Sequence, residues 1–239
     1  MRLEQSRARS ALEAAALIAV MVGWWRFGAR RLVADEPTAV VALAGGAVML
    51  AAIGAMTWLG RSFASLGLRR DGVARDVRTG ILFVVPAYLV TTTVSLALAA
   101  VALGLGVASV ESLSEAKMPI VRLLGRTPPA SVLPLALFVA TYEEIAFRGF
   151  LLTRLAALAG PTAAIATSSV VFGLLHEASQ GWLGVVQTTC VGVVLATLTL
   201  RRRSLWPAIA CHATIDALGI ALLLVVARAL GGVPDASPD

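Results

Sequence analysis

Long apolar runs separated by short charged loops constrain the fold of this chain more than any other feature. A helix needs about 20 apolar residues to cross the hydrocarbon core of a bilayer, and the sequence contains about seven runs of that kind. They cover residues 11–26, 38–59, 80–105, 131–157, 162–177, 181–200 and 205–230. Only 14% of the residues are charged, against about 25% in soluble domains. The sequence therefore predicts an all-α, polytopic transmembrane helix bundle with about seven spanning helices.

Aromatic and basic residues mark the ends of these runs. All five tryptophans (Trp24, Trp25, Trp58, Trp182 and Trp206) fall at predicted ends, where an amphipathic ring prefers the headgroup layer. Arginines cluster in residues 61–78 and 201–203, and the positive-inside rule places both loops in the cytoplasm. With seven spans, the N-terminus is then predicted to be cytoplasmic. The first run lacks a clear small-residue cleavage site after it, so we expect an uncleaved helix.

The basic character of the chain fits a membrane protein better than a nucleic-acid-binding one. The net charge is +6, but the arginines lie where apolar runs end and have no aromatic residues between them. The expected partner is the lipid bilayer, with no nucleic acid. Arginine far outnumbers the single Lys117, and Ala, Val and Leu are abundant, which is typical of a GC-rich bacterial genome. We therefore expect an integral protein of a bacterial cell membrane. Cys190 and Cys211 lack CxxC spacing and are predicted to be small core residues.

Ionisable residues within the apolar runs are the candidates for function. A charged residue at membrane depth costs about 3 kcal/mol on insertion scales, so such residues usually face a protein interior and act there. In the run 131–157, Glu144 and Arg148 are four residues apart and are expected to pair. Glu143 points about 100° away from Glu144 and can face another neighbour. A structural ion pair with one acid near the surface is the alternative interpretation.

Both histidines of the chain lie in later apolar runs. Phe172 and His176 share one helix face at a spacing of four residues, and His212 and Asp216 have the same spacing, so a carboxylate can sit beside the second imidazole. Either histidine alone is more often a satisfied core residue. Their joint occurrence with the acid pair in three of the last four runs predicts one buried polar site.

Two kinds of hydrolytic chemistry are compatible with these side chains. A carboxylate beside an imidazole in a water-poor cavity can deprotonate one water and direct it at a carbonyl, while a second imidazole and a polar neighbour stabilise the oxyanion. Glu143, His176, His212 and Asp216 can fill these roles. Alternatively, Glu143, His176 and His212 can form a three-ligand catalytic zinc site with an open position for water. The zinc signature with two histidines four residues apart on one helix is absent, which disfavours the metal slightly.

A proton- or ion-coupled transporter is the main alternative function. In that case the buried Glu and His groups form a relay that spans the depth of the bilayer, whereas hydrolytic groups converge on one point. A catalytically inactive membrane scaffold is a third possibility.

Three motifs occur in order within the apolar runs: Glu143-Glu144-x-x-x-Arg148, Phe172-x-x-x-His176 and His212-x-x-x-Asp216. Over roughly residues 131–225 they resemble the CAAX prenyl protease and bacteriocin-processing (CPBP, or abortive-infection) family of intramembrane endopeptidases. The first motif alone is a weak signal, but three ordered motifs are a strong one. The first three runs contribute nothing specific to the resemblance.

The resemblance implies an activity and a role for each motif residue. It implies a type II CAAX protease-like endopeptidase that hydrolyses a peptide bond in a membrane-associated peptide or protein. Glu143 and His176 would activate the water, His212 and the residue at 216 would bind the oxyanion, and Glu144, Arg148 and Phe172 would support them. Eukaryotic relatives remove the last three residues of a prenylated C-terminus, and bacterial relatives are linked to peptide processing, bacteriocin self-protection or envelope regulation.

One motif position and the cofactor stay open at this point. The family more often has Asn where this chain has Asp216. An ionised Asp cannot donate a hydrogen bond, so Asp216 either is protonated or orients His212. Family members are described both as metalloproteases and as metal-free glutamate enzymes, so either no cofactor or a divalent metal such as Zn is compatible. The predicted organisation is N-terminal transmembrane helices and loops over 1–130, a protease-like core over 131–225 and a disordered tail over 231–239.

Overall fold

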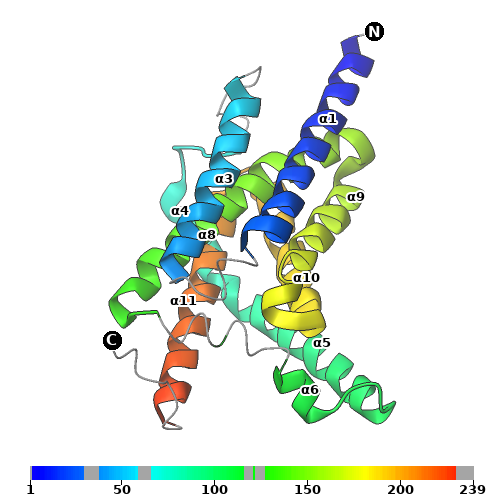
Figure 1. The fold of residues 1–239 in the computed structure, drawn as a ribbon. Coiled ribbons are helices and arrows are strands. Elements are labelled where there is room, and N and C mark those ends of the chain that lie inside the picture. The colour runs from blue at the N-terminus through cyan, green and yellow to red at the C-terminus, as the bar shows by residue number, and fades with distance from the viewer. Residues whose placement is uncertain (1, 30–37, 59–65, 116–120, 122–126, 230–239) are drawn as a thin grey trace.

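The computed structural model describes residues 2–29, 38–58, 66–115, 121 and 127–229, and these ranges form a bundle of helices without a strand (Figure 1). The predicted all-α fold is therefore confirmed. The elements are α1 (Arg2–Gly23), η1 (Trp24–Ala29), α3 (Thr38–Trp58), α4 (Val73–Leu82), α5 (Val84–Gly104), α6 (Val110–Glu115), η3 (Pro129–Ser131), α8 (Val132–Glu144), η4 (Ile145–Leu151), α9 (Leu152–Leu174), α10 (Glu177–Arg202) and α11 (Trp206–Ala229).

The apolar helices account for the predicted spans. Within the described ranges, five stretches are long and apolar enough to cross a membrane: Arg7–Gly28, Val73–Gly104, Pro129–Leu174, Ser179–Arg202 and Trp206–Val225. Val40–Ala55 is a shorter apolar helix. The stretch Pro129–Leu174 is divided at Gly160, whose φ of 81° and ψ of 169° break the helix before Pro161. Its two legs match the predicted runs 131–157 and 162–177, so about seven apolar helices are present, and the chain is an integral membrane protein.

Close helix crossings at glycine hold the bundle together. α9 packs against α10, and a Cβ atom added to Gly173 would lie 2.6 Å from the Val185 carbonyl oxygen of α10. α11 packs against both α8 and α4, and a Cβ at Gly80 of α4 would lie 2.2 Å from the Pro207 carbonyl oxygen. Only glycine allows backbones to approach this closely, as is common between membrane helices. The crossings fix where α9 and α11 carry their polar side chains.

The two arginine-rich loops that were predicted to share the cytoplasmic side lie at one end of the bundle. Arg202 donates to the buried carboxylate of Asp76 through Nε at 3.0 Å and Nη2 at 2.5 Å. The Trp206 indole donates to the Arg69 carbonyl oxygen at 2.6 Å. These contacts join α4 to the end of α10, and the loop before α4 to the start of α11. Which side of the membrane they face stays a prediction.

Several predictions fall partly or wholly outside the described residues. The disordered tail 231–239 lies there, as do Arg61, Lys117 and the last residue of the run 205–230. The two cysteines are free thiols: Cys211 is buried against Val84 and Ala87 of α5, and Cys190 is partly exposed. The division of the chain at residue 130 stays a prediction.

Candidate active site

A cavity of about 560 Å³ brings the predicted site residues together. Glu143 of α8, His176 between α9 and α10, and His212 and Asp216 of α11 all line it. The remaining wall combines apolar side chains from α1, η1, α3, α8, η4, α9 and α11 with hydroxyl and amide side chains, mainly from α5 and α10. A cleft of this size with a few converging polar groups is the usual form of a small enzyme site.

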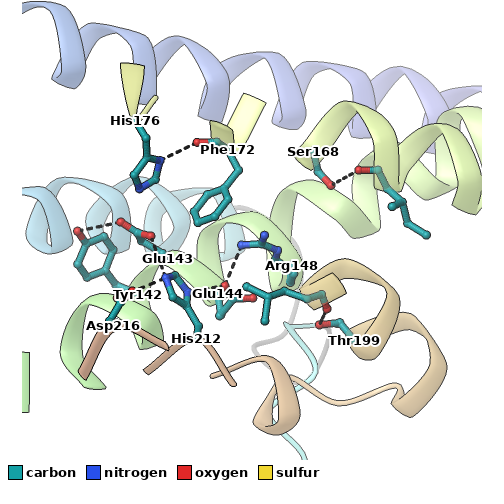
Figure 2. A network of polar contacts seen from close by, with 12 residues as sticks. Tyr142, Glu143, Glu144, Arg148, Ser168, Phe172, His176, Thr199, His212 and Asp216 are labelled. Atoms are coloured by element: carbon teal, nitrogen blue, oxygen red, sulfur yellow. Dashed lines mark hydrogen bonds and ion pairs between the residues drawn. The ribbon is translucent and has the colours of Figure 1, made fainter. Parts of the chain in front are cut away.

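Glu143 lies next to the imidazole of His212 (Figure 2). Its Oε2 atom is 3.8 Å from His212 Nε2, and the same nitrogen is 3.5 Å from Asp216 Oδ2. The Tyr142 hydroxyl donates to Glu143 Oε1 at 3.5 Å. Two carboxylates and one imidazole nitrogen therefore meet at one place on the cavity wall, although α8 and α11 are far apart in the sequence.

Below this group, Glu144 joins Arg148 to His212. One oxygen of Glu144, Oε1, accepts from Arg148 Nη1 and lies against His212 Nδ1, both at 2.8 Å. Glu144 is 0% exposed and Arg148 1%, so the three groups form a buried, charge-assisted network. The expected Glu144–Arg148 pair is confirmed. The network also indicates that Glu144, rather than Asp216, holds His212 through Nδ1, and that Nε2 is the nitrogen directed at the cavity.

His176 reaches the cavity from another direction. Its Nδ1 lies 2.8 Å from the Phe172 carbonyl oxygen, one helical turn earlier. A carbonyl only accepts, so Nδ1 carries the proton and Nε2 of the neutral ring keeps a free lone pair. The Phe172 ring meets His176 edge-on at 4.9 Å between centroids and His212 at 5.8 Å. Phe172 thus contacts both histidines, and Figure 2 shows its ring between them.

Phe172 also covers the buried cation. Arg148 Cζ lies 4.3 Å from the Phe172 ring centroid, and Phe147 packs edge-on against Phe172 at 4.7 Å. Arg148 belongs to η4, a π-helical turn that begins directly after Glu144; such turns are frequent at functional sites. The aromatic cover and the wide turn together keep Arg148 away from the cavity surface.

The site contains buried polar atoms whose hydrogen-bonding capacity is not used by the described residues. Oε2 of Glu143 and Oε2 of Glu144 are buried without a hydrogen-bond partner in this part of the chain. The Glu143 atom belongs to a side chain that lines the cavity, where a water can approach it. An oxygen of this kind is the acceptor that a water-activating carboxylate needs.

The arrangement of the His, Cys, Asp and Glu side chains bears on whether a metal ion could bind in the cavity. In the described ranges, no three His, Cys, Asp or Glu side chains are arranged so that they could hold a metal. His176 Nδ1 and His212 Nδ1 are each taken by a protein acceptor, and the latter shares Glu144 with Arg148. These contacts leave Nε2 of both rings available, and the predicted ligand set of Glu143, His176 and His212 stays a prediction.

The N-terminal helices, which contribute nothing specific to the family resemblance, help to form the cavity. Met21 of α1, Trp24 of η1 and Met49 of α3 line the cavity. Buried Glu13 of α1 accepts from Arg154 Nε of α9 at 3.0 Å, and thereby ties the first helix to the helix that precedes His176. The presence of Glu13 within an apolar run was a signal for such a contact, but nothing in the sequence identified Arg154 as its partner.

Comparison with known proteins agrees with the resemblance. Residues 125–218 match the family model described as type II CAAX prenyl endopeptidase Rce1-like. The predicted family resemblance is thereby confirmed for this part of the chain, which contains Glu143, His176, His212 and Asp216. No curated protein and no solved structure matches the chain. The family match and the apolar helices support a CAAX-protease-type endopeptidase of the membrane.

Proposed function

We propose that this protein is an intramembrane endopeptidase in which Glu143 and His176 activate a water that attacks a peptide bond of a membrane-associated substrate. In this mechanism the water lies between the Nε2 lone pair of His176 and Oε2 of Glu143, which has no hydrogen-bond partner among the described residues. Glu143 removes one proton, and the hydroxide adds to the carbonyl carbon of the substrate. Because the cavity wall is largely apolar, the carboxylate is poorly hydrated and is a stronger base than in water.

The oxyanion of the tetrahedral intermediate needs a donor on the opposite side of the carbonyl. In this proposal the donor is Nε2–H of the protonated His212, because Nδ1–H is already donated to Glu144. A preorganised donor of this kind contributes about 3–4 kcal/mol to transition-state stabilisation. Asp216, at 3.5 Å from Nε2, attracts the imidazolium and holds it on the cavity side. Glu143 then passes its proton to the leaving amine, and the peptide bond breaks.

One observation carries this proposal: Glu143, His176, His212 and Asp216 line the same cavity. Convergence on one place is what a hydrolytic site requires, whereas a proton or ion relay requires groups spread along the depth of the bilayer. The convergence therefore favours hydrolysis over transport.

The proposal is tested with the purified protein in liposomes and a fluorescence-quenched peptide that carries a prenylated cysteine followed by three residues. Wild type is expected to cleave it, and Glu143→Gln and His176→Ala are each expected to reduce cleavage below detection. Glu177→Gln is the matched control, since Glu177 follows His176 but is exposed and does not line the cavity. It should retain wild-type activity within about twofold.

The same assay tests the cofactor. If water is activated by the protein groups alone, extensive treatment with a chelator leaves the cleavage rate unchanged. Loss of activity that returns on addition of Zn²⁺ would replace the metal-free mechanism with the zinc alternative. Full activity of Glu143→Gln would contradict both the metal-free and the zinc mechanism, because each mechanism assigns Glu143 an essential role.

A further inference from the structure

Arginines gather at one end of the bundle, where apolar helices meet the membrane surface. The stretch Ser179–Arg202 ends there, and the stretches Val73–Gly104 and Trp206–Val225 begin there. The ends of apolar spans lie at the level of the lipid headgroups, where tryptophan and arginine are common. The two segments at these ends are residues 66–76 and 201–206. Their arginines are Arg69, Arg70, Arg75, Arg201, Arg202 and Arg203, and their acids are Asp71 and Asp76.

Hydrogen bonds hold the two segments against each other. Arg202 donates to Asp76 through Nε at 3.0 Å, and the Leu205 amide donates to the Gly67 carbonyl oxygen at 3.0 Å. The Trp206 indole donates to the carbonyl oxygen of a loop residue as well, at 2.6 Å. The loop before α4 therefore lies against the turn between α10 and α11, and the arginines of both segments belong to one surface.

The two acids of these segments are each paired with an arginine. Asp76 accepts from Arg202, and Asp71 is paired with Arg69. The remaining arginines are exposed, and each is the sequence neighbour of Arg69, Asp76 or Arg202, which take part in the contacts between the segments or lie beside them. They therefore extend from neighbouring points of the surface. We call them the arginine patch: Arg70, Arg75, Arg201 and Arg203.

The backbone at Arg203 indicates that this side chain is not required by the turn itself. Its φ of 51° and ψ of 39° are left-handed, a conformation in which the Cβ atom crowds the next carbonyl oxygen. Glycine is the usual residue at such a helix end because it has no Cβ atom. The turn between α10 and α11 would thus form with less strain if residue 203 were glycine, and the arginine adds a charge to the patch.

We infer that the arginine patch binds the headgroup of an anionic phospholipid. Guanidinium groups donate pairs of hydrogen bonds to phosphate oxygens, and each basic residue at a membrane surface favours anionic lipid by about fivefold. A lipid with a net negative charge supplies both the phosphate and the charge that the patch lacks. A bound headgroup would join the loop before α4 to the start of α11, the helix that carries His212. The inference does not depend on the proposed peptide hydrolysis.

The test measures which lipid the protein retains. The purified full-length protein in neutral detergent is mixed with equal amounts of phosphatidylglycerol and phosphatidylcholine that have the same acyl chains, and the bound lipids are counted by native mass spectrometry. We expect wild type to prefer phosphatidylglycerol by about tenfold or more. A second sample contains millimolar inorganic phosphate. The preference should remain there, because the acyl chains keep the lipid at the protein surface.

Two variants place the preference in the patch. Arg203→Gly removes one guanidinium group and relieves the strained backbone, so it is expected to lower the preference about fivefold without lowering the unfolding temperature. Arg70→Gln, in an exposed loop, should cause a similar loss and does not alter the turn before α11. Arg26→Gln is the matched control: Arg26 of η1 is exposed, lies outside both segments and carries the same charge. It should keep the wild-type preference.

A loss of preference in Arg203→Gly and Arg70→Gln, with Arg26→Gln unchanged, would support the inference. Equal retention of the two lipids by wild type would overturn it, and so would an unchanged preference in both patch variants. An equal loss in Arg26→Gln would also contradict it, because the preference would then follow the net charge of the protein. Loss of the preference in inorganic phosphate would assign the patch to free anions in place of lipid.

Discussion

At the residue scale, Glu144 is the centre of the site's polar contacts although it does not line the cavity. Its Oε1 accepts from Arg148 and contacts His212 Nδ1, so a single carboxylate oxygen neutralises one cation and fixes the orientation of an imidazole. With Nδ1 occupied, His212 can act toward the substrate only through Nε2. The proposed oxyanion donor, His212, therefore depends on Glu144, which lies one helical turn before Arg148.

This dependence predicts the effect of removing Arg148. The Arg148→Ala substitution removes one of the two partners of the buried Glu144 carboxylate and should lower the free energy of unfolding by about 3–5 kcal/mol. The measurement is an SDS titration in mixed micelles, with Arg78→Ala as the control. Arg78 is an exposed arginine of α4, and its removal should change the unfolding free energy by no more than about 0.5 kcal/mol. If Arg148→Ala leaves the free energy of unfolding unchanged, the Glu144–Arg148 pair is not buried as described.

Residue contacts could be predicted from the sequence only where they lie within one helix. The spacing of four between Glu144 and Arg148 was sufficient to predict their pair, because neighbouring turns bring such side chains together. The contact between Glu144 and His212 joins residues 68 positions apart, and no local pattern specifies it. For the same reason the sequence left the role of Asp216 undecided, since it could not show that another carboxylate already holds His212.

At the element scale, the crossing of α4 and α11 sets the position of the helix that carries His212 and Asp216. A Cβ at Gly80 would meet the Pro207 carbonyl oxygen at 2.2 Å and the Cys211 amide nitrogen at 3.0 Å, and Cys211 directly precedes His212. These are backbone atoms, which cannot move aside as a flexible side chain would. Any larger residue at Gly80 must therefore displace α11 and the imidazole with it.

We accordingly expect Gly80→Ala to destabilise the protein by about 1–3 kcal/mol and to lower the cleavage rate. Gly54→Ala is the matched control in α3, where an added Cβ meets no atom within 4 Å. Because alanine is the better helix former, this control should be neutral or stabilising by about 0.5–1 kcal/mol. Thermal unfolding and cleavage are measured on both variants. A Gly80→Ala protein with unchanged stability and activity would contradict the tight crossing.

The helices themselves were largely predictable from hydropathy, because the bilayer imposes a length on each apolar run. The break between the fourth and fifth runs was also visible, as Gly160-Pro161 interrupts a helix in any environment. The packing partners were not visible, since apolar membrane helices carry little information about which faces meet. The Glu13–Arg154 ion pair between α1 and α9 is an example: each charge was apparent, but their contact was not.

At the scale of the whole molecule, the cavity combines the matched segment with helices outside it. Glu143, His176, His212 and Asp216 lie within residues 125–218, the part that matches the endopeptidase family, as does most of the apolar wall. The rest of the apolar wall comes mainly from α1, η1 and α3, which lie outside that match. The reaction can therefore be proposed from the family, whereas the fit of a particular substrate depends on helices that the motifs do not describe.

The central claim is that Glu143 makes this protein a peptide-bond hydrolase. The most direct measurement compares the termini of membrane-associated peptides and proteins between the native strain and one that carries only Glu143→Gln, at equal levels of the membrane protein. We expect at least one terminus that is created by cleavage to be present with wild type and absent with Glu143→Gln. Identical sets of termini, with both proteins expressed and folded, would contradict it.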